Sequence, residues 1–325
     1  MRAEAVAHPN IALVKYWGKR DERLILPHQS SLSLTLAPLS VRTSVAWGLG
    51  AHEVELNGKA AVGSERQRVV DLLELLRAKD GGLGFAKVVS EGDFPASAGL
   101  ASSAAGFAAL AVAARAAASL PRDVRVESIL ARRGSGSACR SIQGGACIWR
   151  RGERDDGEDS YAEQAFDEHH WPELRMFVAM VSREEKETKS RDGMRLTVET
   201  SPYYPAWTRD AEDEVPRAVQ ALRQRDLEAL GELAERNAWR MHATAIAADP
   251  PLCYLLPKTL QLIHALRAER KNGVLAYFTL DAGPNPVILT VEKHAAAAEE
   301  LARSCGAAEV VRCHVGGDAR VLSSV

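Results

Sequence analysis

An uncharged stretch runs from Phe94 to Ala114, and it limits which folds the chain can adopt. About 20 apolar residues are enough to cross a lipid bilayer. However, the first half of this stretch is mostly Pro, Ser, Gly and Ala, with few strongly lipophilic side chains. The pattern therefore predicts a loop of small residues and then a buried helix over 102–118, with serines at its N-cap, rather than a membrane span.

The composition is that of a globular protein with a large core. The chain has 325 residues, a length that indicates two domains at ~150 residues each. Apolar residues make up 46% and charged residues 26%, which excludes a disordered chain and a small disulfide-stapled fold. With 41 basic and 43 acidic side chains the net charge is −2, so no nucleic acid and no membrane is expected as a partner.

The cysteines and the N-terminus predict a cytoplasmic protein. The five cysteines are odd in number, are scattered and form no C-x-x-C pair, which argues against a disulfide framework and favours a reducing compartment. Glu4 and His8 precede any apolar run, and Ile11 to Val14 is too short for the core of a signal peptide.

The first third of the chain has the patterns of β-strands. Residues 31–36 alternate apolar and polar side chains, as a half-buried strand does, and residues 41–47 are a plausible partner. Residues 52–56 lead into Asn57-Gly58, which indicates a hairpin turn.

The remainder mixes helices and strands irregularly. Helices are predicted at 65–77, 215–222, 227–234, 256–263 and 295–304, and strands at 175–181, 274–280, 287–291, 310–315 and 320–322. Residues 150–170 are polar and acidic and are predicted to be an exposed excursion. The order indicates an α+β protein with two layered domains, 1–182 and 183–325, divided where the composition becomes strongly charged.

The segment 94–106 is the first candidate for chemistry. Gly99, Ser102, Ser103 and Gly106 are small and lie just before the predicted helix, so backbone N–H groups and the helix dipole could bind an anion. The serine hydroxyls could contact phosphate or Mg²⁺. The segment is neither a Walker A loop nor a G-x-G-x-x-G fingerprint, and an Ala/Ser helix chosen for close packing explains the residues about equally well.

Three further segments carry charged side chains among turn formers. Arg140 lies in a Gly/Ser loop and could clamp an oxyanion. Lys15 and Lys19, with aromatic residues between them, suit a phosphate-facing surface. Asp281 follows an apolar strand and opens the turn Asp-Ala-Gly-Pro-Asn285, where a carboxylate could act as a general base. Taken singly, each has a commoner explanation, respectively a surface arginine, solvated lysines and an Asx-type turn.

Other polar side chains are weaker candidates. His169-His170 lies in an acidic loop without the usual spacing of metal ligands, and Cys305 and Cys313 have no metal-binding neighbours in the sequence. His242 and His264 fall in predicted helices, which favours packing or surface positions.

Together the four charged or Gly/Ser segments resemble the diphosphomevalonate decarboxylase family, within the GHMP small-molecule kinase superfamily. The resemblance runs through most of the chain. It rests on Asn10 to Lys19, Gly99 to Gly106, Gly134 to Ser141, Ser190 to Met194 with Thr197 and Thr200-Ser201, and Thr279 to Asn285. Gly-Leu-Ala-Ser-Ser indicates only the superfamily, whereas Lys-Tyr-Trp-Gly-Lys, Gly-Ser-Gly-Ser-Ala-Cys-Arg and Asp-Ala-Gly-Pro-Asn in this order are specific to the decarboxylase.

The resemblance implies a fold, a reaction and a set of partners. The fold would be the two-domain GHMP type, with mixed and antiparallel sheets packed against helices and the active site in a cleft between the domains. The reaction would be the ATP- and Mg²⁺-dependent decarboxylation of mevalonate 5-diphosphate to isopentenyl diphosphate, ADP, phosphate and CO₂, through phosphorylation of the 3-hydroxyl. Members are often homodimers.

The resemblance also implies roles for individual residues. Asp281 would deprotonate the 3-hydroxyl, Lys15 would keep that carboxylate ionised, and Arg140 would clamp the substrate carboxylate. The substrate positions are Tyr16, Lys19, Arg66, Ser137, Ser190 and Arg191. The ATP positions are Gly99, Leu100, Ala101, Ser102 and Ser103, and Ser103 is also the candidate Mg²⁺ ligand.

Three alternatives remain at this stage. Two are sister enzymes, a mevalonate 3-kinase and a decarboxylase of the 5-monophosphate; the third is a non-catalytic paralogue that only binds a ligand. The number of donors argues for a diphosphate, Asp281 together with Arg140 argues against a simple kinase, and retention of both the base and the loop serines argues against a binding module.

Overall fold

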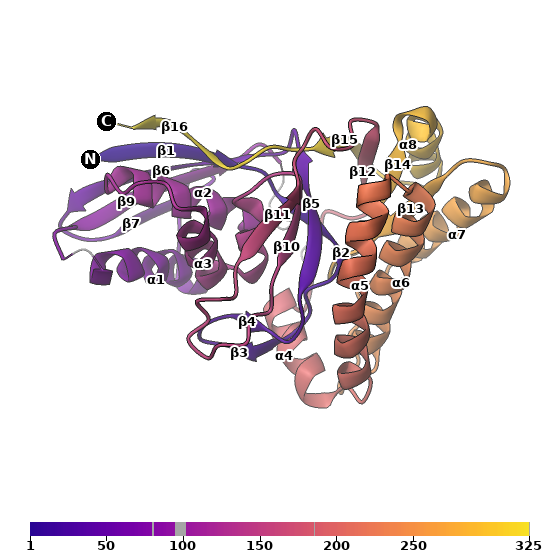
Figure 1. Cartoon of the computed structure of the whole chain (residues 1–325), viewed down its shortest axis with the longest axis horizontal. Helices are drawn as coiled ribbons and strands as arrows, with labels where there is room; N and C mark the ends of the chain where they lie inside the picture. The colour runs from indigo at the N-terminus through magenta and orange to yellow at the C-terminus, as the bar shows by residue number, and fades with distance from the viewer. Residues whose placement is uncertain (80, 95–101, 185, 325) are drawn as a thin grey trace.

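Two large β-sheets and the helices packed on them form the molecule (Figure 1). The computed structural model describes residues 1–79, 81–94, 102–184 and 186–324. Within these residues, one sheet has six strands in the order β16-β1-β6-β9-β7-β8, and the other has eight, β11-β10-β5-β15-β12-β14-β13 with β2 paired to β5. The mixture of sheets and helices confirms the α+β prediction.

The strands of the N-terminal half are β1 (Arg2–Ala7), β2 (Asn10–Val14), β3 (Lys19–Asp21), β4 (Leu26–Pro27), β5 (Ser31–Ala37), β6 (Val41–Leu49), β7 (Glu53–Leu56), β8 (Lys59–Ala60), β9 (Phe85–Gly92), β10 (Ala146–Trp149), β11 (Ala162–Phe166) and β12 (Leu174–Met180). Those that follow are β13 (Ala276–Thr279), β14 (Val287–Val291), β15 (Glu309–Val315) and β16 (Arg320–Ser324). The helices are α1 (Gly63–Lys79), α2 (Ser102–Ala117), α3 (Val124–Gly134), α4 (Ser190–Thr200), α5 (Tyr204–Gln224), α6 (Leu227–Ile246), α7 (Pro257–Lys271) and α8 (Ala295–Ser304), with 3₁₀ turns η1 (Gly136–Ser141) and η2 (Glu292–His294).

Helix α2 is the element that the uncharged stretch predicted. More than half of its residues are alanines, and 12 of its 16 residues are buried. Small side chains allow close approach to β1 and β6, and the indole Nε1 of Trp47 in β6 donates a hydrogen bond of 3.0 Å to the carbonyl of Ala114. Among the described residues, no helix is both long and apolar enough to cross a membrane.

The C-terminal segment of the chain returns to the N-terminal half. Strand β16 pairs antiparallel with β1, which places the two ends of the chain side by side (Figure 1). Strand β15 pairs with β5 on one side and with β12 on the other. Each half of the sequence therefore supplies strands to sheets of the other half, and the boundary near residue 182 remains a prediction.

Three details differ from the sequence-based expectations. Strand β5 is buried on both faces instead of half-buried, because the hydroxyls of Ser31 and Ser33 bond to the guanidinium of Arg140. Strand β6 pairs with β1 and β9 rather than with β5. Part of the supposed excursion at 150–170 is strand β11, which pairs with β10.

Candidate active site

The side chains of Lys15 and Asp281 form the centre of the site, although they are far apart in the sequence. Lys15 follows β2, and its Nζ donates to Oδ1 of Asp281 at 2.6 Å and to the carbonyl of Ala12 at 2.7 Å. Thr279, in β13, also donates to the Ala12 carbonyl, at 2.9 Å. Because both side chains donate to this carbonyl, the end of β13 is held against β2. Asp281, two residues after Thr279, is thereby placed beside Lys15.

Burial makes this ion pair electrostatically strong. The side chain of Lys15 is 1% exposed and that of Asp281 31%, so the ammonium is enclosed while the carboxylate remains accessible. Burial lowers the pKa of Lys15, and the charge of Asp281 opposes this shift. An unpaired ammonium at this buried position would be strongly destabilising. The carboxylate of Asp281 therefore stabilises the charged form of Lys15.

Arg140 lies on η1 and is held by neutral oxygens. Its Nε donates to Oγ of Ser33 at 3.0 Å, and its Nη1 donates to Oγ of Ser31 at 2.6 Å. In the part of the chain that the structure describes, no carboxylate lies within salt-bridge distance of this guanidinium. Burial lowers its pKa, and the charge of Asp281 is close enough to act in the opposite sense. An enclosed cation fixed by neutral partners is suited to bind an anion.

Asn10 ties the Arg140 loop to β2. Its amide nitrogen donates to the carbonyl of Ser137 at 3.0 Å and to Oγ of Ser141 at 2.7 Å, and its Oδ1 accepts from Nε of Arg140 at 3.3 Å. The structure therefore joins the Ser137 backbone and Arg140 to the strand that ends at Lys15. The sequence analysis did not single out the Asn10 side chain.

A second group of predicted residues gathers around Tyr16. The Tyr16 ring packs on Trp149 with centroids 4.6 Å apart, and its hydroxyl is buried without a hydrogen-bond partner among the described residues. Lys19 pairs with Glu22. Burial is the main cause that lowers the pKa of Lys19, and the positive charge of Arg191 adds to it. The charge of Arg191 also influences the pKa of Tyr16. The predicted residues Tyr16, Lys19 and Arg191 are therefore close to one another.

Arg66 lies outside this group. Its guanidinium donates to the backbone carbonyl of His52 at 3.1 Å. Two residues further along α1, Arg68 lies over the ring of Phe107, 5.2 Å from its centroid. Burial lowers the pKa of Arg68, and the charge of Arg191 contributes. The charge of Arg191 therefore reaches Arg68, which the sequence did not single out, and the role of Arg66 stays a prediction.

The phosphate-loop prediction falls partly outside the described residues, since Gly99, Leu100 and Ala101 lie there. Ser102 and Ser103 open α2, and Oγ of Ser103 is 3.2 Å from Oγ of Ser135. The first turn of α2 contains no acidic residue. Backbone N–H groups, hydroxyls and the helix dipole fit an anionic phosphate, and a hydroxyl oxygen fits a hard cation such as Mg²⁺.

Lys186 is a further residue beside the carboxylate that sequence reasoning missed. Its Nζ donates to the carbonyl of Ala282 at 2.6 Å and to Oγ of Ser190 at 2.7 Å. Burial lowers the pKa of Lys186, and the charge of Asp281 opposes the shift. Lys186 lies in the charged run after Ser182, which in the sequence marked only a domain boundary. Its closeness to the Ser190-Arg191 motif was the available signal.

Helix α6 supplies two more residues behind the site. The backbone N–H of Lys15 donates to Oδ1 of Asn237 at 2.8 Å, and Nδ2 of Asn237 donates to Glu214 at 2.6 Å. His242 is buried, and its pKa responds to Lys15, Asp281 and the backbone of Leu280. The apolar periodicity predicted this helix, but it gave no reason to select its polar positions.

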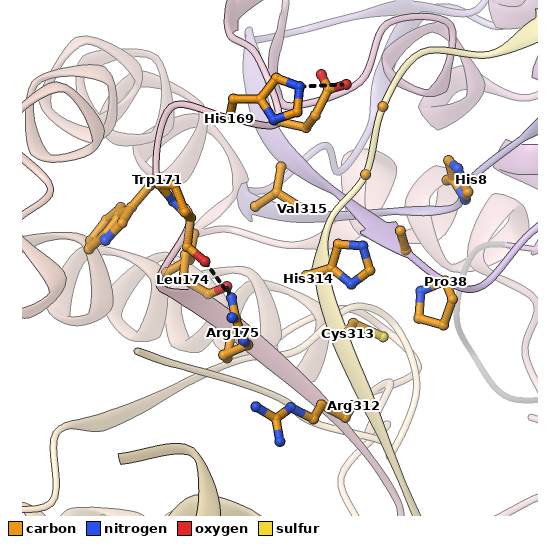
Figure 2. Close-up of a pocket in the computed structure, with 15 residues that line it drawn as sticks. His8, Pro38, His169, Trp171, Leu174, Arg175, Arg312, Cys313, His314 and Val315 are labelled. Atoms are coloured by element: carbon orange, nitrogen blue, oxygen red, sulfur yellow. Dashed lines mark hydrogen bonds and ion pairs between the residues drawn. The ribbon is translucent and has the colours of Figure 1, made fainter. Parts of the chain in front are cut away.

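A separate hollow of about 890 Å³ contains none of the predicted site residues. Figure 2 shows His8, His314 and Arg312 around it, and Arg175 from β12. Arg175 and Arg312 both pair with Glu292, at 2.5 Å each. The two guanidiniums share this one carboxylate, so their positive charge is partly compensated within the chain, in contrast to that of Arg140.

Two family models match nearly the whole chain. The model described as diphosphomevalonate decarboxylase-like N-terminal domain matches residues 7–162, and the model described as mevalonate 5-diphosphate decarboxylase C-terminal domain matches residues 176–319.

Individual relatives agree with the family models. The diphosphomevalonate decarboxylase mvd1 of Aspergillus fumigatus is 40% identical over 313 residues, which cover 90% of this chain and 77% of that protein. The Bos taurus diphosphomevalonate decarboxylase is 41% identical over 310 residues, which cover 87% and 75%.

Solved structures share the fold. A structure described as MDDEF in complex with MVAPP, AMPPCP and magnesium superposes with a TM-score of 0.93 at 39% identity and covers 99% of both chains. Mevalonate diphosphate decarboxylase from Staphylococcus aureus gives a TM-score of 0.93 at 34% identity, covering 99% of this chain and 98% of that one. The chain belongs to the diphosphomevalonate decarboxylase family.

Proposed function

We propose that this chain converts mevalonate 5-diphosphate and ATP to isopentenyl diphosphate, ADP, phosphate and CO₂, with Asp281 accepting the proton of the 3-hydroxyl. A tertiary hydroxyl is a poor leaving group, whereas its phosphate ester is a good one. The oxygen therefore attacks the terminal phosphorus of ATP and ADP departs. The C3–O bond of the new phosphate ester then breaks, phosphate leaves with its electron pair, and CO₂ is lost as the electron pair of the C–C bond to the carboxylate forms the alkene.

The 2.6 Å contact between Lys15 and Asp281 is the observation that carries this assignment. A carboxyl group with the ordinary pKa of ~3.9 is too weak a base to remove an alcohol proton completely, so proton transfer accompanies phosphoryl attack. The Lys15 ammonium lies against this carboxylate. It also stabilises negative charge on the phosphoryl oxygens.

The other predicted residues divide between the two ends of the substrate. Arg140 binds the carboxylate that becomes CO₂, with Ser137 in the same loop. Tyr16, Lys19, Ser190 and Arg191 bind the 5-diphosphate. Arg66 is the predicted diphosphate ligand from α1, and we add Arg68 to this group because the charge of Arg191 reaches it.

ATP and Mg²⁺ are the cosubstrate and the cofactor. The N-terminus of α2 would hold the ATP phosphates through its N–H groups, together with Gly99 to Ser103, and Ser103 would supply a hydroxyl ligand. The bound cation neutralises phosphate charge. Among the described residues no cluster of three His, Cys, Asp or Glu could hold a metal.

The oligomeric state, the domain boundary and the cellular compartment of the protein are also part of the proposal. We place the protein in the cytoplasm as a homodimer, with a domain boundary near Ser182 and the substrate between the two domains. The five cysteines, all free thiols, support a reducing compartment. Size-exclusion chromatography with light scattering tests the homodimer, and a mass near the 35.2 kDa of one chain would contradict it.

A coupled assay that measures ADP and CO₂ together tests the proposed function. With mevalonate 5-diphosphate we expect both products in equal amounts. ADP without CO₂ would indicate a 3-kinase, and neither product would indicate a binding protein. Faster turnover of the 5-monophosphate than of the 5-diphosphate would contradict the assigned substrate.

A further inference from the structure

The backbone of Lys15 is held by side chains, because this residue lies just beyond the end of β2. Its N–H donates to Oδ1 of Asn237 at 2.8 Å, and its carbonyl accepts from Nε2 of Gln29 at 3.2 Å. Both side chains are buried. Buried backbone polar groups need partners, and here the partners are amides from other parts of the chain. The position of the Lys15 backbone therefore depends on how these amides are fixed.

Glu214, on α5, orients the amide of Asn237. Nδ2 of Asn237 donates to Oε2 of this carboxylate at 2.6 Å, and Glu214 is itself only 2% exposed. An ionised carboxylate can only accept hydrogen bonds, and a backbone N–H can only donate. The NH₂ group of Asn237 must therefore face Glu214, which leaves its carbonyl oxygen for Lys15. The opposite orientation of the amide would leave both neighbours without a partner.

Two arginines of α6 bind the other oxygen of Glu214. Nε of Arg236 donates to Oε1 at 2.8 Å, and Nη1 of Arg240 donates to the same oxygen at 3.2 Å. A buried carboxylate is tolerated when charged donors satisfy it. Oε1 thus joins α5 to α6, which lie side by side next to β2 (Figure 1). Oε2 faces Asn237, so the network continues through that amide to Lys15.

We infer that Asn237, oriented by Glu214, is a positioning residue for Lys15: it fixes the backbone after β2 and so holds the Lys15 ammonium against Asp281. A lysine side chain is a long flexible stem, so its ammonium is placed precisely only when the backbone that carries it is fixed. This inference rests on the proposed role of Asp281. It adds a requirement, because the cation beside the base is then placed by two helices behind the site.

Four variants separate positioning from packing. Asn237→Leu keeps the size of the side chain and removes both of its hydrogen bonds. Asn237→Asp keeps the acceptor for Lys15 but places a second carboxylate against Glu214. In the double variant Asn237→Asp/Glu214→Gln, the new glutamine can donate to the new aspartate, which still accepts from Lys15. Thr244→Val is the control, since the buried Thr244 hydroxyl bonds only within α6, to the carbonyl of Arg240 at 2.8 Å.

We expect Asn237→Leu to lower kcat about tenfold to a hundredfold, because small displacements of catalytic groups are costly. The KM for ATP should stay within about twofold, since the nucleotide is not bound by Lys15 alone. Asn237→Asp should lose kcat as well, the double variant should recover most of that loss, and Thr244→Val should match the wild type.

Wild-type kcat in a folded Asn237→Leu variant would overturn the inference. So would a double variant that is no faster than Asn237→Asp, because packing rather than the paired amide and carboxylate would then explain the losses. Should Asn237→Leu not fold, the comparison of Asn237→Asp with the double variant decides the question by itself.

Hydrogen exchange of the Lys15 backbone amide tests the same contact in the full chain without substrate. In Asn237→Leu this amide should exchange at least about tenfold faster than in the wild type, because it loses its acceptor. Amides of β6, in the other sheet, should keep their wild-type rates. An unchanged rate at Lys15 would contradict the inference. Loss of the proposed base is recognised separately, since an active Asp281→Asn enzyme would leave the exchange result unaffected.

Discussion

At the scale of single residues, the site depends on how each buried charge is compensated. Lys15 is paired with a carboxylate, whereas Arg140 is held by serine and asparagine oxygens. The first arrangement places a cation against the proposed base, and the second leaves a cation ready for an incoming anion. The hydrogen-bond partners of Lys15 and Arg140 thus suit these two neighbouring cations to different roles in the same site.

Arg140→Gln tests the second of these tasks. The variant loses a charge-assisted hydrogen bond to the substrate carboxylate, which is worth about 1.5–3 kcal/mol. We expect a tenfold to hundredfold loss in kcat/KM for mevalonate 5-diphosphate and a change below twofold in the KM for ATP. Arg125→Gln, at an exposed position of α3, is the control. Equal losses for both substrates would place Arg140 at the nucleotide instead.

The buried His242 predicts how stability depends on pH. Its pKa is about 4 in the folded chain and near 6.5 when unfolded, so between these values the unfolded state binds more protons. The free energy of unfolding therefore falls as the pH decreases, by about 2 kcal/mol from pH 6.5 to 4.5 through this residue alone. Urea unfolding at the two pH values should show a difference of this size between the wild type and His242→Gln. Identical pH dependence in the two proteins would refute the shift.

At the scale of elements, the sequence predicted which segments are helices and strands better than it predicted their neighbours. The apolar spacing of 65–77 and the small residues of 102–118 located α1 and α2, because period and side-chain size are local properties. Strand pairing depends on distant segments, and the partner expected for 31–36 was wrong for that reason.

The same distinction explains the outcome for the site. Lys15, Arg140 and Asp281 were predicted from motifs. Arg66 and Arg68 differ by about 200° around a helix, so only the placement of α1 decides how each lies toward the site. Lys186 and His242 likewise depend on how a charged segment and a helix pack against β13, which no local pattern reveals.

Gly231→Ala tests the packing of α6 on β13. A Cβ at this position would lie 2.1 Å from the ring of Tyr277, and the ring is buried. We expect a loss of about 1–3 kcal/mol in the free energy of unfolding, measured by denaturant titration. Because α6 carries Asn237 and His242, kcat should decrease as well.

Gly106→Ala is the matched control in another helix. A Cβ there meets no atom within 4 Å, so alanine should raise stability by roughly 0.5–1 kcal/mol through its helix propensity. If Gly231→Ala proved as stable as Gly106→Ala, the close packing of α6 on Tyr277 would be disproved.

At the scale of the whole molecule, the two halves of the chain are interwoven. Strands β15 and β16 come from the C-terminal part, yet they pair with β5 and β1. The site combines residues from β2, η1 and the end of β13, so it exists only when both halves are assembled.

A fragment of residues 1–182 tests this interdependence. Without β15 and β16 it would expose the edges of β5 and β1 and lose a large part of its core, so we expect no cooperative unfolding transition and a poorly dispersed NMR spectrum. Adding residues 183–325 in trans should restore at least part of the native signal. A fragment that folds cooperatively alone would show that the N-terminal half is an independent unit.

The most direct test of the central claim is single-turnover analysis of Asp281→Asn with mevalonate 5-diphosphate and ATP. Asparagine keeps the shape of the side chain but cannot accept the hydroxyl proton, so both ADP and CO₂ release should fall by at least about a hundredfold. ATP affinity should stay within about twofold, and Asp213→Asn, an exposed change on α5, should leave all rates unchanged. An Asp281→Asn enzyme that releases ADP and CO₂ at most of the wild-type rate would contradict the account.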